Sequence, residues 1–157
     1  MKKVLIALDY NPTAQKIAET GYAFANAMGA QVTLLHVVTE PLYYSSRLYS
    51  PIMGFGGFDE IDYVQPEVIG EIITNAYRFL NLVKIHLDDD TILTEVIEGE
   101  VAQVILDTAK YSKADLIIMG SHSRKWLEDI VLGSVTKSVI HQTSIPMVII
   151  PTNVISL

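Results

Sequence analysis

Short apolar runs alternate with stretches of helical periodicity along the whole chain. The apolar runs are typical of strands buried on both faces of a parallel sheet, and they span residues 4–8, 32–38, 116–119 and 147–150. Residues 92–97 are β-branched enough for a further strand. Apolar residues at helical spacing fill the intervals and predict helices from Asn11-Pro12 to Gly29, from Pro66 to Val83, over 101–109 and over 135–142.

This regular alternation predicts an α/β fold with right-handed crossovers, a parallel sheet and helices on both of its faces. One stretch breaks the rhythm, because residues 41–65 contain four Tyr and two Phe but little periodicity. No repeat or linker is visible, so we expect a single domain over 1–157 with a long loop at about 41–65. Such a loop is either a lid or partner-binding arm, or a flexible insertion.

Composition narrows the class of protein. Half of the 157 residues are hydrophobic and 18% are charged, which excludes intrinsic disorder. A formal net charge of -7 argues against nucleic acid as a partner. The absence of cysteine excludes disulfide scaffolds and thiol chemistry. No run approaches a membrane span, and the first apolar run is too short for a signal peptide, so we expect no membrane association and a cytoplasmic location.

The most informative segment lies between the fourth strand and the fourth helix. It begins with Gly120-Ser121-His122-Ser123-Arg124-Lys125 and closes with Gly133-Ser134 at a helix start. Small residues, basic side chains and a helix N-terminus together describe a cradle for phosphate. The alternative is an ordinary strand-to-helix connection with a Gly turn and a Ser cap. Asp9, at the end of the first strand, either accepts hydrogen bonds from a base or ribose, or is a turn residue.

Several standard signatures are missing. Neither a P-loop nor a Gly-x-Gly-x-x-Gly fingerprint follows a strand. The four histidines lack metal-ligand spacing, and His36 is interpreted as a satisfied core residue, so no metal site is assigned. No nucleophile elbow or acid pair stands out, and no catalytic residue is assigned. The sequence therefore favours a binding site over a catalytic one, with Mg²⁺ expected only in company with nucleotide phosphates.

The chain resembles the universal stress protein family, in its single-domain, nucleotide-binding form. The resemblance covers essentially the whole length in the expected element order. Its strongest blocks are residues 4–9, Leu34-Leu35-His36-Val37, residues 116–122, Gly133-Ser134-Val135 and residues 145–150. Family members that bind ATP share the pattern Gly-x-x-Gly, nine residues, Gly-Ser/Thr. Gly120, the spacer and Gly133-Ser134 match it, whereas Ser123 replaces the second glycine.

The resemblance implies a nucleotide site and a fold. By carry-over, Ala7 and Asp9 line the base and ribose pocket, and Val37 offers backbone groups to adenine. The ribose would contact Met119 and Gly120. The phosphates would be held by Ser123, Gly133, Ser134 and Val135, to which we add Arg124 from its charge and position. The fold implied is a Rossmann-like, adenine nucleotide alpha hydrolase-like sheet of five parallel strands in the order 3-2-1-4-5.

The leading functional hypothesis is an adenine-nucleotide-binding stress-response protein that acts by binding and dimerisation, and whose ligand is ATP or another adenine nucleotide, with Mg²⁺. The resemblance also implies a homodimer through the last strand, Met147–Ile150, an apolar edge that needs cover or pairing. Slow ATP hydrolysis is left open but has no visible general base. An alternative hypothesis is a nucleotide-independent interaction module that uses the Tyr-rich loop 41–65. A third is a hydrolase or nucleotidyl transferase that uses His122 and Asp9.

Overall fold

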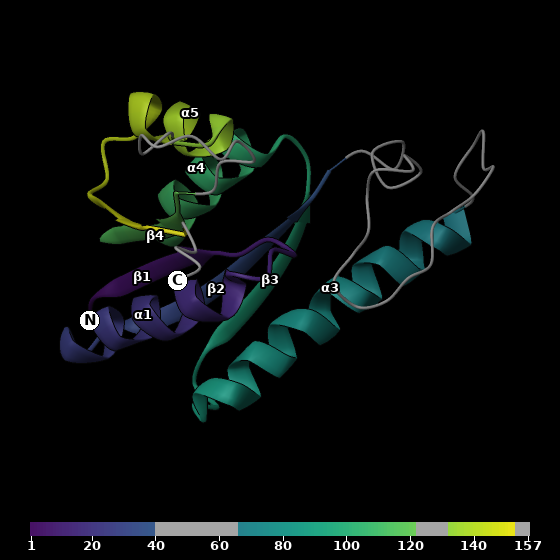
Figure 1. The fold of residues 1–157 in the computed structure, drawn as a ribbon, viewed down its shortest axis with the longest axis horizontal. Helices are drawn as coiled ribbons and strands as arrows, with labels where there is room; N and C mark the ends of the chain where they lie inside the picture. The colour runs from purple at the N-terminus through teal and green to yellow at the C-terminus, as the bar shows by residue number, and fades with distance from the viewer. Residues whose placement is uncertain (40–65, 122–131, 153–157) are drawn as a thin grey trace, which may run out of the picture.

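The computed structural model describes residues 1–39, 66–121 and 132–152 (Figure 1). These residues form one sheet of five parallel strands in the order β3-β2-β1-β4-β5, which confirms the fold class and strand order expected above. The elements are β1 Lys3–Ala7, α1 Ala14–Ala27, β2 Gln31–Val38, α3 Pro66–Leu87, β3 Leu93–Glu98, α4 Val101–Ser112, β4 Leu116–Gly120, α5 Ser134–Gln142 and β5 Met147–Ile150. None of the described helices is long and apolar enough to cross a membrane.

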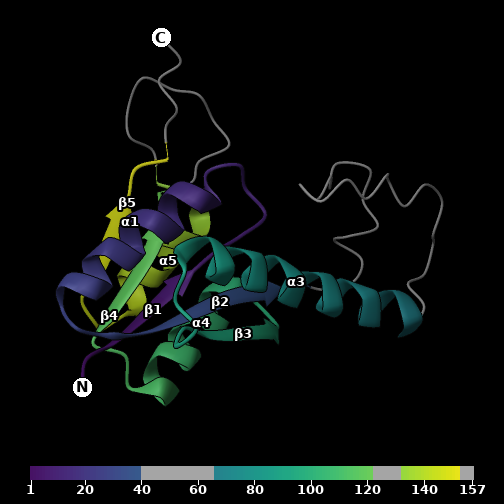
Figure 2. The same cartoon turned by 90° about the horizontal axis from the view of Figure 1, so that it is seen from below.

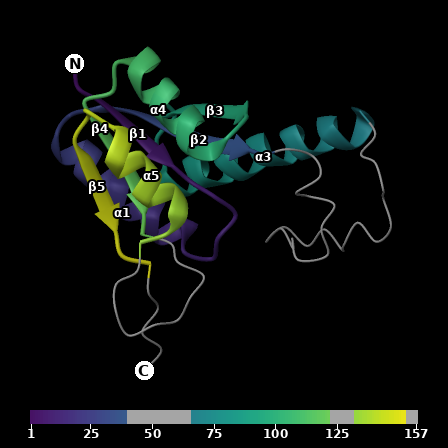
Figure 3. The ribbon, with the colours of Figure 1, turned by 90° about the horizontal axis from the view of Figure 1, so that it is seen from above.

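Helices cover both faces of the sheet. Figure 2 shows α1 and α3 on one face, and Figure 3 shows α4 and α5 on the other. Each strand supplies both layers because successive side chains point to opposite faces. On β1, for example, Ile6 packs in the core under α1 and α3, whereas Leu5 packs in the core under α4 and α5. This double burial is why the strands are continuous apolar runs in the sequence.

Local signals start and stop the helices. Gly29 adopts a φ of +62° directly after α1, a left-handed conformation that glycine takes without strain. Asn11 lies two residues before the N-cap position of α1. The cap residue of α1 is Thr13, and the Asn11 side-chain oxygen accepts hydrogen bonds from the Thr13 amide and hydroxyl. The turn before α1 is thus closed by a side chain, as is common for Asn in turns.

The strand order defines where the chain reverses direction across the sheet. From β1 the chain passes through α1 to β2 and through α3 to β3 on one side, and α4 then carries it back to β4 on the other side of β1. The carboxyl ends of β1 and β4 therefore flank the topological switch point, where α/β sheets of this kind bind ligands. The predicted loop at 41–65 lies outside the described residues.

Candidate functional site

The carboxyl edge of β2, β1 and β4 brings together most of the predicted site residues. They lie at the end of β1 (Ala7, Asp9), in β2 (Val37), at the end of β4 (Met119, Gly120) and at the start of α5 (Gly133, Ser134, Val135). Ser123 and Arg124, as well as His122, lie outside the described residues. The sheet thus places eight of the ten predicted positions at or near one edge, around the switch point.

Two hydrogen bonds attach the start of α5 to the end of β4. The Gly133 amide donates to the Ser121 carbonyl at 3.0 Å. The buried hydroxyl of Thr136 donates to the Gly120 carbonyl, also at 3.0 Å. Because these bonds join both ends of the segment that contains Ser123, the N-terminus of α5 is held beside the carboxyl end of β4. Proximity of these two ends is what the phosphate-cradle interpretation requires.

The N-terminus of α5 presents backbone amides as hydrogen-bond donors, and among the described residues no acidic side chain caps them. Its first helical hydrogen bond runs from the Lys137 amide to the Gly133 carbonyl, so the amides of Ser134, Val135 and Thr136 precede it. The cap residue, Gly133, is extended and has no side chain that could accept a hydrogen bond from these amides. Unpaired amides and the helix dipole together favour a negatively charged ligand at such a position.

The neighbouring helix shows the opposite arrangement. The carboxylate of Glu100, which caps α4, accepts hydrogen bonds from the Ala102 amide at 3.1 Å and from the Gln103 amide at 2.7 Å. The N-terminus of α4 is therefore satisfied by an internal anion at the same edge of the sheet. Of these two helix starts on the α4/α5 face, the one next to β4 is the better candidate for an external anion.

Gly120 has a packing role that sequence reasoning missed. A Cβ atom at this position would lie 2.5 Å from Ile17 Cδ1 and 2.9 Å from Thr152 Cγ2. Both neighbours are buried, one on α1 and the other after β5. The glycine is therefore needed for the close approach of two protein segments, whether or not a ligand also approaches its backbone.

Asp9 is exposed at the end of β1, and its two neighbours contact His36. The Nδ1 atom of His36 lies 2.8 Å from the Leu8 carbonyl oxygen, and its ring lies 4.4 Å from that of Tyr10. The sequence interpretation of His36 as a satisfied core residue is correct for only one ring nitrogen. Nε2 is buried and has no hydrogen-bond partner within the described segments. Burial lowers the pKa of His36, although the bond to Leu8 and the charge of Asp9 oppose this effect.

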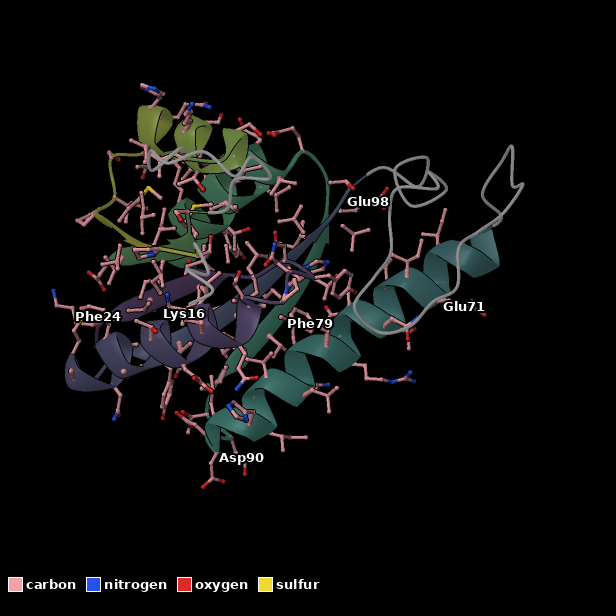
Figure 4. All side chains as sticks on the ribbon, in the orientation of Figure 1. Lys16, Phe24, Glu71, Phe79, Asp90 and Glu98 are labelled. Carbon is pink, nitrogen blue, oxygen red and sulfur yellow. The ribbon has the colours of Figure 1, made fainter. Side chains whose placement is uncertain are left out.

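A lysine from α1 also lies near this edge. Lys16, labelled on α1 in Figure 4, donates from Nζ to the Pro151 carbonyl at 2.8 Å, directly after β5. Across residues 1–39, 66–121 and 132–152, no group of three or more acidic or histidine side chains could hold a metal ion. The described part of the site therefore offers amides, a hydroxyl and a carboxylate, which suit an organic ligand with both hydroxyl and anionic groups.

Comparison with known proteins relates the sequence and the fold to one family. A family model described as the universal stress protein family matches residues 1–151. Universal stress protein MJ0577 of Methanocaldococcus jannaschii is 28% identical over 156 residues, covering 95% of this chain and 94% of that protein. Its solved structure, described as hypothetical protein MJ0577, superposes with a TM-score of 0.71 over 97% of this chain and 96% of that one.

Two other solved structures in this fold were determined with adenine nucleotides. A universal stress protein in complex with cAMP superposes with a TM-score of 0.60 at 15% identity, covering 95% of each chain. The universal stress protein from Archaeoglobus fulgidus in complex with dAMP has a TM-score of 0.62 at 16% identity, covering 96% of this chain and 98% of that one. At these identities the likeness concerns the fold alone.

Proposed function

Because this chain belongs to the universal stress protein family, we propose that it binds an adenine nucleotide at the carboxyl edge of β2, β1 and β4. The observation that carries the proposal is the N-terminus of α5, which is hydrogen-bonded to the end of β4 and presents amides ahead of its first helical bond. The cAMP and dAMP complexes of proteins with the same fold support an adenine nucleotide as the ligand class.

Each described residue has a chemical role in this proposal. The amides of Ser134 and Val135 and the Ser134 hydroxyl donate to phosphate oxygens, which are strong acceptors. Asp9 accepts from ribose hydroxyls or from the base, and the backbone of Val37 contacts adenine. Met119, buried at the end of β4, contributes apolar contact with the ribose. The form we expect is ATP with Mg²⁺, in which the cation arrives on the phosphates rather than on a dedicated protein site.

The proposal concerns binding, and nothing in it requires hydrolysis. It extends to a homodimer in which the β5 strands of two subunits pair. β5 lies at the end of the described sheet, and Met147, Val148 and Ile149 are partly exposed along it. An apolar edge strand of this kind presents unpaired backbone groups to a second chain.

Calorimetry with ATP and Mg²⁺ tests the nucleotide proposal. We expect Ser134→Ala to weaken ATP by about tenfold, the effect of losing a hydrogen bond to a charged group, and to leave adenosine binding unchanged. Ser138→Ala is the matched control, since it removes the same hydroxyl one turn further along α5. Absence of binding at millimolar ATP in both the natural sequence and Ser123→Gly would refute the proposal. Equal effects of the two serine variants would place the phosphates elsewhere.

The dimer is tested by sedimentation of Ile149→Pro. The Pro146 carbonyl accepts from Ile117 in β4, and the Ile150 carbonyl accepts from Ser121 directly after β4. By the alternation along a strand, the Ile149 amide therefore points away from β4. Proline removes that outward amide and leaves the pairing with β4 in place. The natural sequence should sediment as a dimer and Ile149→Pro as a folded monomer. A natural chain that stays monomeric up to the highest protein concentration measured would contradict this part of the proposal, because dimerisation depends on concentration.

A further inference from the structure

His36 interrupts an apolar row on β2. Val32, Leu34, His36 and Val38 alternate toward the face that α1 and α3 cover, and the other three are aliphatic and buried. His36 is itself only 3% exposed. A buried polar ring in such a row loses its contacts with water and needs a compensating interaction.

Among the described residues, only the Nδ1 atom of the His36 ring has a hydrogen-bond partner. The Leu8 carbonyl can only accept, so His36 Nδ1, 2.8 Å away, must carry the proton and donate. In the neutral ring Nε2 is then a bare acceptor, and it is buried without a hydrogen-bond partner in the part of the chain described. An aliphatic side chain would fill this space without an orphaned nitrogen. The specific contribution of histidine at position 36 is therefore the Nδ1–H bond to Leu8.

His36 contacts both sequence neighbours of Asp9, Leu8 through this hydrogen bond and Tyr10 through a contact between the two rings. His36 holds the Leu8 carbonyl, and its ring lies 4.4 Å from the Tyr10 ring at an interplanar angle of 40°. Phe79, which points from α3 toward the sheet in Figure 4, supports both rings, with centroid distances of 5.1 Å to Tyr10 and 6.0 Å to His36. Both neighbours of the exposed Asp9 are thus held from the protein interior.

We infer that His36 is a positioning residue for Asp9. By holding the Leu8 carbonyl and the Tyr10 ring, it orients the Asp9 carboxylate toward the ribose or base of the nucleotide. The inference rests on the proposed nucleotide function. It has a physical basis because a carboxylate on a short turn loses its hydrogen bonds when its backbone shifts by a fraction of an ångström, unless neighbouring groups hold that backbone in place.

The geometry of the ring suggests a matched set of variants. Asparagine carries an amide nitrogen at the same distance from Cβ as Nδ1, so His36→Asn can still donate to Leu8. Glutamine carries its nitrogen near the position of Nε2, so His36→Gln keeps a polar group but moves the donor. His36→Leu fills the space without a donor. Val32→Ala is the stability control, because it weakens the same face of β2 at the end remote from Asp9.

Calorimetry of these variants with ATP, and separately with tripolyphosphate, gives the decisive comparison. We expect His36→Leu, His36→Gln and Asp9→Asn each to weaken ATP binding by about tenfold and to leave tripolyphosphate binding unchanged. His36→Asn should stay within about threefold of the natural sequence. Adding His36→Leu to Asp9→Asn should weaken ATP no further, since both changes remove one function. Equal affinities for the Asn and Leu variants, or an additive double variant, would overturn the inference.

A second readout does not need the ligand and separates the two proposals. In ¹⁵N spectra of the nucleotide-free protein, His36 should show a protonated Nδ1 and a bare Nε2. His36→Leu should shift the Asp9 and Tyr10 amide signals, whereas His36→Asn and Val32→Ala should leave them in place. Absence of ATP binding by both the natural sequence and Ser123→Gly would refute the proposed function only. Unmoved Asp9 and Tyr10 signals in a folded His36→Leu would refute the positioning role.

Discussion

Gly120→Ala is expected to destabilise the protein through packing alone. The new methyl group would lie 2.5 Å from Ile17 Cδ1 and 2.9 Å from Thr152 Cγ2. Ordinary contacts of a Cβ atom begin at 3.4 Å, so one neighbour must move by almost 1 Å. Neither can do so freely. Ile17 is buried on the face of α1 that packs against the sheet. Thr152 is held at Ser121 Oγ, which accepts from its amide at 3.1 Å and lies 3.3 Å from its hydroxyl.

The expected magnitude follows from overpacking in a close-packed core. Inserting a methyl group into such a site costs about 1–3 kcal/mol. For a domain of this size each kcal/mol lowers the melting temperature by roughly 2–4 °C, so we expect a decrease of about 2–12 °C in thermal denaturation followed by circular dichroism. Gly70→Ala is the matched control. An added Cβ there meets nothing within 4 Å in the exposed part of α3, and the change should stabilise the protein by about 0.5–1 kcal/mol.

A double variant identifies the atoms responsible. Ile17→Val removes the Cδ1 atom that the new methyl would meet, so its combination with Gly120→Ala should be less destabilising than the sum of the two single changes. Additive effects, or a Gly120→Ala protein as stable as Gly70→Ala, would refute the packing explanation. The prediction also affects ligand studies, because lost nucleotide binding in Gly120→Ala would report altered packing and would not identify a phosphate contact.

Three further predictions concern ionisable groups. Burial lowers the pKa of His36 below its ordinary value of 6.5, so below about pH 6.5 this residue binds a proton more readily in the unfolded chain than in the folded one. In urea denaturation the free energy of unfolding should therefore fall as the pH drops below about 6.5, and it should fall less steeply in His36→Asn. Glu100→Ala should lower the free energy of unfolding, measured in urea, by about 0.5–2 kcal/mol, because two amides of α4 lose their acceptor. An unchanged midpoint of urea denaturation would show that water replaces the carboxylate with no loss of stability. The pKa of Tyr22 is raised chiefly because its hydroxyl donates to the Asp89 carboxylate, and Asp89→Asn should lower it in an NMR titration; a Tyr22 pKa that does not change would exclude the bond in solution.

The element order could be predicted from the sequence because of the way this sheet is covered. Strands with helices on both faces are apolar on both sides, so they stand out as continuous runs between stretches of helical spacing. Asp9 and Gly133-Ser134 could be placed near the site for the same reason, since each follows a strand or begins a helix. The strand order was implied by the family resemblance rather than by periodicity, because pairing depends on residues far apart in the chain.

The sequence by itself therefore determined the order of the elements and the chemical types gathered at the strand ends. Tertiary structure alone decided how those groups are held. The bond between Gly133 and Ser121, the contact of Gly120 with Ile17 and Thr152, and the bond of His36 to Leu8 each join residues between 12 and 103 positions apart. Their geometry depends on helices and strands packing to within tenths of an ångström. Local patterns carry no information at that scale, because propensity and periodicity describe only a residue's nearest neighbours along the chain.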